Sequence, residues 1–181
     1  MSGEYASQVG GDFVSRVCAL LDNRYGFHVF QVSGMAPDAA SVPEETGNNR
    51  IRFDILLDQT RIDNSHNPPI EKKMYFYCEC KWRTSTNDLK AQLKEFLIKA
   101  LKASPALQRQ HSNDFGFIFI SNKPFGVDQT DLETVSYISQ LLDDRPINVE
   151  ATVRLCSKIG ILFVSDWFLQ TTARGRIRRL R

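Results

Sequence analysis

Three charged side chains interrupt two apolar segments of this chain. Glu79 and Lys81 lie in the segment 75–82, and Asp54 lies in the segment 51–57. Side chains alternate along a strand, so Glu79 and Lys81 project from the same face. Buried charges are costly unless they are paired or bound, and such exceptions concentrate at functional sites. Two carboxylates beside an ammonium predict a site that holds a divalent metal ion and hydrolyses a phosphodiester.

The elements that position these residues follow from apolar periodicity. In chain order we expect a helix near 13–21, strands over 27–32, 51–57 and 74–82, a helix over 87–103, a strand over 115–121, helices over 130–142 and 150–158, a strand over 161–164 and a short helix from 166. The first three strands can pair as a meander, whereas helix-connected strands imply parallel crossovers. The predicted fold class is α/β, with a mixed central sheet flanked by helices on both faces.

Two polar segments, 33–49 and 59–73, are expected to be loops. Asp58 and Asp63 are assigned to the solvated second loop, and Trp82 to the core. In the helix 87–103, Gln92 falls at the edge of the apolar stripe, because it lies three residues after Leu89 and four before Phe96. The lysines of this helix lie mostly away from the stripe: Lys90, Lys94, Lys99 and Lys102.

Length and composition are those of one globular domain: 181 residues, 42% hydrophobic and 24% charged. No segment approaches the roughly 18 apolar residues of a membrane span, and no signal-peptide pattern opens the chain. We therefore expect a cytoplasmic protein without membrane contact.

The cysteines and histidines are too scattered for a zinc site. Cys78 and Cys80 share the strand face opposite to Glu79, where they are expected to pack as small apolar groups.

Positive charge is concentrated at the C-terminal end, in residues 173–181. Five arginines lie there: Arg174, Arg176, Arg178, Arg179 and Arg181. The net charge of +2 includes these five charges, so the rest of the chain carries −3. Such a tail is either an arm that contacts nucleic-acid phosphates or a link to a further domain. The folded domain is expected to span 1–172.

The order of these motifs resembles the PD-(D/E)xK nucleases, which share the restriction-endonuclease-like fold; Asp54, Glu79 and Lys81 match their motif. More narrowly, the segments 10–13 and 26–29 (Gly-Gly-Asp-Phe and Gly-Phe-His-Val) resemble the opening motifs of Mrr-like restriction endonucleases and archaeal Holliday-junction resolvases. The segments 119–125 and 161–166 resemble strands of the same proteins, and Gln92 takes the place of a recurring glutamine. The resemblance spans roughly residues 10–170. It implies an endonuclease that cleaves DNA, in defence against foreign DNA or in repair, and that in many relatives is a homodimer.

Each residue type has a task in this chemistry. Mg²⁺ prefers oxygen ligands, commonly one or two carboxylates with waters and substrate phosphate. We expect Asp54, Glu79 and the backbone carbonyl of Cys80 to hold Mg²⁺ or Mn²⁺, which polarises the phosphate and activates a bound water. Lys81 is expected to orient that water and stabilise charge on the phosphate, a contact worth roughly 10²- to 10³-fold in rate. Gln92 is expected to hold the water or a phosphate oxygen, and Arg83 to contact the DNA backbone.

Two departures from the family pattern leave alternatives open. Phe53 stands in place of the proline of the family name, and Val14 stands where relatives often carry a glutamate. Asp12 or Glu4 can supply a third carboxylate, or the site uses fewer. The alternative function is a catalytically inactive nuclease-like module that binds DNA or assembles into a larger protein; a third is a domain that binds only protein. The non-functional interpretation of Glu79 and Lys81 is a surface ion pair worth about 0–1 kcal/mol.

Overall fold

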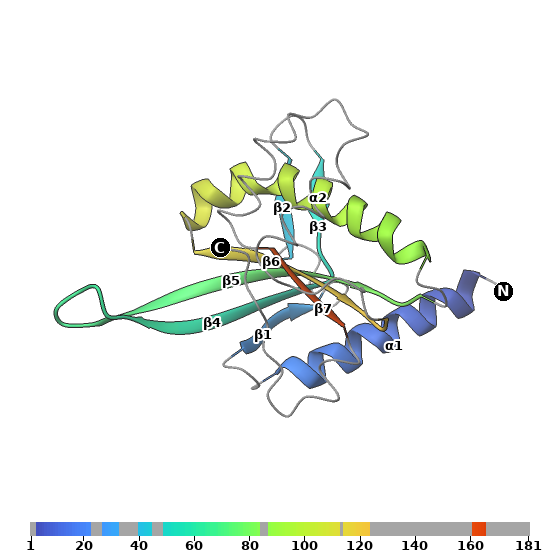
Figure 1. Cartoon of the computed structure of the whole chain (residues 1–181), viewed down its shortest axis with the longest axis horizontal. Helices are drawn as coiled ribbons and strands as arrows, with labels where there is room; N and C mark the ends of the chain where they lie inside the picture. Colours follow the sequence, from blue (N-terminus) through green and yellow to red (C-terminus); the bar gives the residue numbers. More distant parts are fainter. Residues whose placement is uncertain are drawn as a thin grey trace.

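The fold is described from a computed structural model of the chain (Figure 1). The residues described are 3–22, 27–32, 40–44, 49–83, 87–112, 114–123 and 161–165. The helices are α1 (Gly3–Leu21) and α2 (Asn87–His111). The strands are β1 (Phe27–Val32), β2 (Ser41–Pro43), β3 (Arg50–Arg52), β4 (Ile55–Asp63), β5 (Ile70–Lys81), β6 (Phe115–Ser121) and β7 (Ile161–Ser165).

The described strands form a mixed central sheet in the order β1-β4-β5-β6-β7, with β2 and β3 paired separately. β1, β4 and β5 are antiparallel neighbours, whereas β5, β6 and β7 are parallel. The crossover from β5 to β6 is made by α2, as a parallel connection requires. Figure 1 shows α1 and α2 on opposite sides of this sheet. The predicted α/β class with a mixed sheet is confirmed.

Alternation along the central strands divides the core into two layers. Ile55 and Cys78 pack in the layer that contains α1, whereas Leu56 and Tyr77 pack in the layer that contains α2. Cys80 is also in the α1 layer, so the predicted packing of both cysteines opposite to Glu79 is confirmed. β6 is buried at every residue, as expected of a strand covered on both faces.

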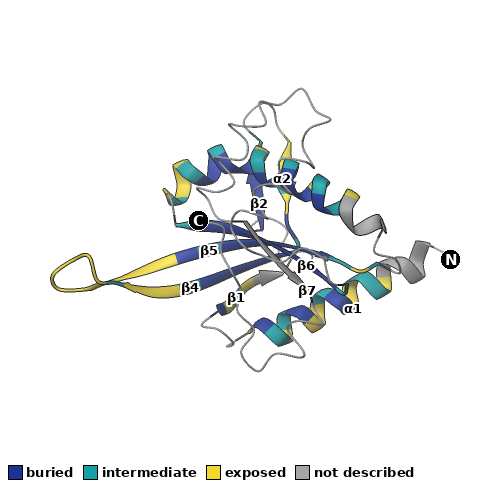
Figure 2. Ribbon diagram, viewed as in Figure 1, coloured by how far each residue is buried: buried dark blue, intermediate teal, exposed yellow. Residues whose placement is uncertain are grey.

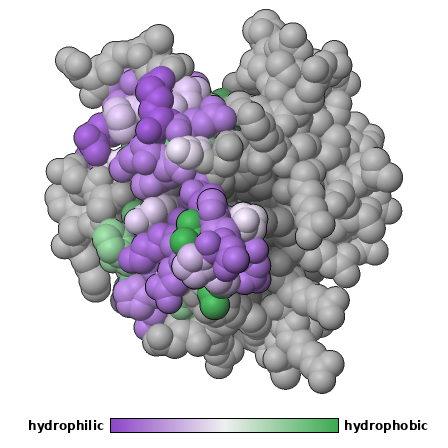
Figure 3. Space-filling model, turned by 90° about the vertical axis from the view of Figure 1, so that its left-hand side faces the viewer, coloured by the Kyte–Doolittle hydropathy of each residue, from purple (hydrophilic) through white to green (hydrophobic). Residues whose placement is uncertain are grey.

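The predicted loop over 59–73 is wrong, because β4 and β5 continue to pair through it. Their register runs from Ile55↔Cys78 to Asp63↔Ile70, which leaves only 64–69 as the turn. The outer part, residues 60–73, projects from the body as a hairpin arm whose residues are nearly all exposed (Figures 1 and 2). Viewed from the side of the arm, the described surface is mostly hydrophilic with small separate hydrophobic patches (Figure 3). With solvent on both faces, these strands need no apolar alternation, and their sequence therefore resembles a loop.

Four other local predictions also need correction. The expected strand 51–57 is broken into β3 and β4, and α2 extends beyond 103 to His111. Asp58 lies buried in β4 rather than in a solvated loop. Trp82 is 37% exposed rather than in the core, and its ring packs edge-on against Phe13 of α1 at 5.6 Å.

Several predicted features lie outside the described residues: the helices over 130–142, 150–158 and from 166, and the arginines at 174, 176, 178, 179 and 181. Of the long loop expected over 33–49, the described part contains β2. Within the described part of the chain, no helix is long and apolar enough to cross a membrane.

Candidate active site

Asp54 lies at the bend between β3 and β4. Just before it, the N–H of Phe53 donates to the carbonyl of Ala40 at 2.9 Å, so the chain has left its partner strand β5 there. Asp54 itself still contacts β5 in two ways: its N–H donates to the carbonyl of Cys78 at 2.9 Å, and its Oδ2 accepts the N–H of Cys80 at 2.7 Å. These two hydrogen bonds hold the Asp54 carboxylate beside Glu79, whose negative charge acts on it.

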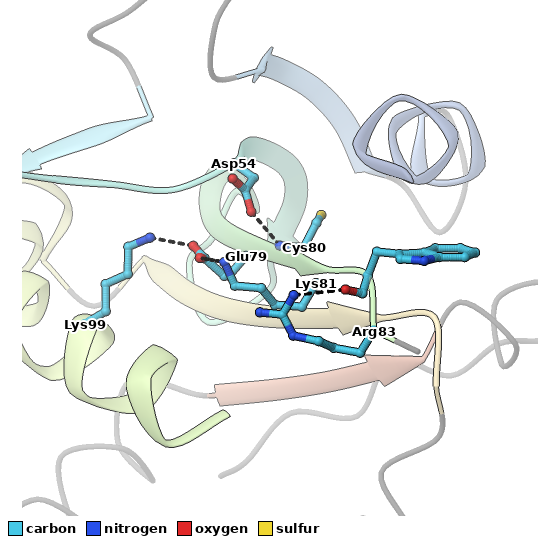
Figure 4. Close-up of polar contacts among 7 residues, drawn as sticks. Asp54, Glu79, Cys80, Lys81, Arg83 and Lys99 are labelled. Atoms are coloured by element: carbon cyan, nitrogen blue, oxygen red, sulfur yellow. Dashed lines mark hydrogen bonds and ion pairs between the residues drawn. The ribbon is translucent and has the colours of Figure 1, made fainter. Parts of the chain in front are cut away.

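Glu79 and Lys81 project from the same face of β5, as predicted (Figure 4). Glu79 is only 6% exposed. Its Oε1 lies 2.6 Å from Nζ of Lys81, whose side chain is about one quarter exposed at 26%. A surface ion pair would leave both groups in water, whereas here the carboxylate is buried. Asp54 is close enough for its pKa to respond to the charges of both Glu79 and Lys81, so the structure brings the three predicted residues together.

Lys99 of α2 is a fourth charged residue at this position, which the sequence analysis missed. Its Nζ lies 2.5 Å from Oε2 of Glu79 and 4.8 Å from the centroid of the Phe53 ring. Figure 4 shows Lys99 reaching Glu79 from the helix while Lys81 reaches it along the strand. Lys99 lies three residues after Phe96 and four before Ala103, both buried. By this spacing Lys99, like Gln92, lies at the edge of the apolar stripe of the helix.

The electrostatics of the four groups are strongly linked. Burial raises the pKa of Asp54, and the negative charge of Glu79 raises it further, against the lowering effects of the Cys80 N–H and of the two lysines. Burial by itself would lower the pKa of Lys81, but the charge and hydrogen bond of Glu79 outweigh it and raise that pKa. Lys81 therefore stays an ammonium at neutral pH. With the two carboxylates ionised, their charge is formally balanced by the two ammoniums.

The remaining predicted site residues lie near this cluster in different ways. Cys80 presents its N–H to Asp54, while its thiol packs in the α1 layer. Gln92 is partly buried on α2, and it lies seven residues before Lys99, so the two share one helix face. Arg83 follows β5, and its Nη1 donates to the carbonyl of Trp82 at 3.0 Å.

Asn122 fixes the chain just after β5, and this role was not foreseen. Its Oδ1 accepts the N–H of Arg83 at 2.8 Å, and its Nδ2 donates to the Arg83 carbonyl at 2.9 Å. The two hydrogen bonds tie the end of β5 to the end of β6. Asn122 therefore positions the backbone that follows the candidate site in β5.

The donor set suits a hard divalent cation. Two neighbouring carboxylates offer oxygen ligands, which favour Mg²⁺ or Mn²⁺ over softer metals. No third acidic residue joins them in the described part of the chain: Asp12 is exposed, and the Glu4 side chain lies outside it. Among the described residues, no group of three or more His, Cys, Asp or Glu side chains is arranged to hold a metal ion. The arrangement fits a site in which the protein supplies two carboxylates and water or substrate supplies the other ligands.

A second buried carboxylate on the same hairpin provides a natural control. Asp58 is 5% exposed, and its carboxylate lies 2.9 Å from Lys73 Nζ and 3.6 Å from His28 Nδ1. Unlike the partners of Glu79, the side chains of Lys73 and His28 are more than half exposed. Asp58 is thus a buried carboxylate that contacts an exposed lysine and an exposed histidine.

Comparison of the chain with family models, with curated proteins and with solved structures gives no match. The α/β fold with a mixed sheet stands on the structure itself. The relation to PD-(D/E)xK nucleases remains a prediction from motif order and residue type.

Proposed function

We propose that this chain is a metal-dependent phosphodiesterase, specifically an endonuclease that cleaves DNA. The observation that supports this proposal most is the cluster itself: Glu79 lies 2.6 Å from the Lys81 ammonium, and its charge acts on Asp54 beside it. Two neighbouring carboxylates and a protonated lysine offer the oxygen ligands and the positive charge that metal-dependent phosphodiester hydrolysis uses.

Each residue of the cluster has a proposed role. Asp54 and Glu79 hold Mg²⁺ or Mn²⁺, with the backbone carbonyl of Cys80 as a further ligand. When bound, the metal ion polarises the scissile phosphate and lowers the pKa of a coordinated water. Lys81, kept protonated by Glu79, stabilises negative charge that develops on the phosphate. Gln92 donates its side-chain amide to the attacking water or to a phosphate oxygen.

The choice of DNA as substrate, and of defence or repair as the biological role, rests on the motif resemblance and on the arginine-rich segment 173–181. Arginines bind phosphates independently of base sequence, and their contribution falls with salt concentration. We also propose a cytoplasmic location, and that two copies act together to cut both strands.

One specific observation favours a second candidate, a nuclease-like module without catalytic activity. Both oxygens of Glu79 are bound by ammonium groups. In addition, the described residues contain no third acidic ligand. A module of this kind binds DNA or a partner subunit through the same fold and leaves the carboxylates as a structural cluster.

Plasmid cleavage tests the two candidates against each other. Supercoiled plasmid is incubated with Mg²⁺ or Mn²⁺ and with the wild type, Asp54→Asn or Asp58→Asn protein. The nuclease proposal predicts nicking by the wild type and by Asp58→Asn, and none above background by Asp54→Asn. Cleavage that survives Asp54→Asn, or a wild type that shifts DNA in a gel but never cuts it, contradicts the nuclease proposal. The second of these results supports the inactive module.

A further inference from the structure

We propose that Lys99 competes with the divalent metal ion for Glu79, so that a metal ion must displace this ammonium in order to bind. The inference rests on the proposed function, because it concerns metal binding at the same carboxylates. It assigns to Lys99 a role that neither the motif resemblance nor the spacing of the sequence predicted.

The geometry places Lys99 where a metal ligand atom would be needed. Oε2 of Glu79 contacts Nζ of Lys99 at 2.5 Å, and Oε1 contacts Nζ of Lys81 at 2.6 Å. A carboxylate that gives both oxygens to ammonium groups has lost its most accessible positions for a cation. Lys81 is fixed close to Glu79 by the strand, two residues away, whereas Lys99 reaches across from α2. Lys81 therefore stays next to Glu79 in any rotamer, whereas a change of rotamer takes the Lys99 ammonium away from the cluster.

Phe53 holds Lys99 in this position. The Lys99 ammonium lies 4.8 Å from the centroid of the Phe53 ring, within the range of a cation–π interaction. The ring is itself fixed, because it is 1% exposed and packs against Tyr77 and Phe117 at 5.4 and 5.6 Å. The residue that departs from the family name thus provides a rigid surface for the competing cation.

The charge balance explains why the competition matters. Two ammoniums already balance the formal charge of Asp54 and Glu79, so a divalent ion that enters while both ammoniums stay in place leaves the cluster with a net charge of +2. If Lys99 loses its charge, the cluster carries one net negative charge and attracts the ion. The charge of Lys99 also lowers the pKa of Asp54, so Lys99 acts on both carboxylates. Lys99 consequently sets the affinity of the site for metal.

Calorimetric titration with Mn²⁺, without DNA, tests the proposal independently of cleavage. The variants are Lys99→Met and Lys99→Gln, which remove the charge, and Lys99→Arg, which keeps it. Lys102→Met is the matched control: Lys102 lies on the same helix but pairs with Glu44 at 3.2 Å, away from Glu79. Thermal melting of each variant verifies that it is folded.

We expect Lys99→Met and Lys99→Gln to bind Mn²⁺ about tenfold more tightly than the wild type, because a unit positive charge close to the ion has been removed. Lys99→Arg and Lys102→Met should bind as the wild type does. Equal affinity in all five proteins overturns the competition while leaving the proposed function intact. If none of them binds Mn²⁺, the proposed function fails and the competition fails with it.

Discussion

The β4–β5 hairpin contains two buried carboxylates that look alike and differ in their surroundings. Glu79 and Asp58 are 6% and 5% exposed, and each contacts a lysine of β5. Around Glu79, both lysines are only about one quarter exposed, and the Glu79 charge acts on Asp54 nearby. Around Asp58, the side chains of Lys73 and His28 are exposed by more than half.

The difference shows that burial of a charge does not by itself indicate a site. Asp58 is neutralised by Lys73, whose side chain is half exposed to solvent. Pairing with an exposed lysine is a common way to accommodate a carboxylate in a strand. Glu79 is neutralised by groups that are themselves largely enclosed, and a second carboxylate stands beside it. Although two ammoniums balance the formal charge, the Glu79 carboxylate still raises the pKa of Asp54, and a divalent cation bound to both carboxylates would oppose this effect.

The largest difference between the two clusters is expected when the lysine of each is replaced by methionine. Lys81→Met should lower the rate of plasmid cleavage by about 10²- to 10³-fold, because it removes the charge that stabilises the developing phosphate dianion. Lys73→Met removes the equivalent lysine beside Asp58 and should leave the rate unchanged. Initial rates of nicking at saturating Mn²⁺ measure both. Equal losses in the two variants would show that general charge, rather than this cluster, controls activity.

The carboxylates themselves should differ in their effect on folding. Glu79→Gln leaves two partly buried lysines with only Asp54 to balance them, and we expect a loss of about 2 kcal/mol, less than for a fully buried pair. Asp58→Asn breaks a contact with exposed cations and should cost at most about 1 kcal/mol. Urea unfolding at neutral pH gives both free energies of unfolding. A larger loss for Asp58→Asn would reverse the comparison.

Asp54→Asn should stabilise the fold, in contrast to both of these variants. The pKa of Asp54 is raised above its ordinary value of 3.8 by burial and by Glu79, so its ionisation costs the folded state more than the unfolded state. This penalty is complete above the raised pKa and disappears as the pH falls through it towards 3.8. The asparagine can still accept the N–H of Cys80. Melting temperatures should therefore rise on substitution at neutral pH, and the gain should shrink in acid; a gain that grows in acid contradicts the assigned cause.

The smallest effect is expected at the far end of the same hairpin. Arg61 and Lys72 are paired in register, so residues 62–71 can be replaced by an Asn-Gly turn that joins them. The removed residues are almost all exposed, and the core clusters contain none of them. We expect the stability to change by less than about 1 kcal/mol. A much larger loss of stability, measured by urea unfolding, would mean that the arm is part of the folding unit.

The central part of the fold was predictable because its residues obey simple periodicities. Alternation in 75–82 placed Glu79 and Lys81 on one face and the cysteines on the other. The arm was not predictable in this way, because strands exposed on both faces carry no apolar alternation and their polar residues are those of loops. The break between β3 and β4 at Phe53 could not be predicted either, because a buried aromatic residue is as common in a continuous strand as next to a bend.

Only part of the candidate site could be predicted from the sequence. Asp54, Glu79 and Lys81 stand out because charges are rare in apolar strands. Lys99 does not, because a lysine on an amphipathic helix is ordinarily solvated. Its contact with Glu79 depends on the position of α2 over the sheet, which is a tertiary feature. The helical spacing from Phe96 and Ala103 indicates only that Lys99 can reach the edge of the core.

The proposed function requires that a cation binds between Asp54 and Glu79. Diffraction from crystals soaked in Mn²⁺, recorded where manganese scatters anomalously, shows whether it does. We expect an anomalous peak coordinated by the carboxylates of Asp54 and Glu79, with the Lys99 ammonium moved away from Glu79. Fully occupied manganese at other positions, with both lysines still on Glu79 and no peak beside Asp54, would contradict it.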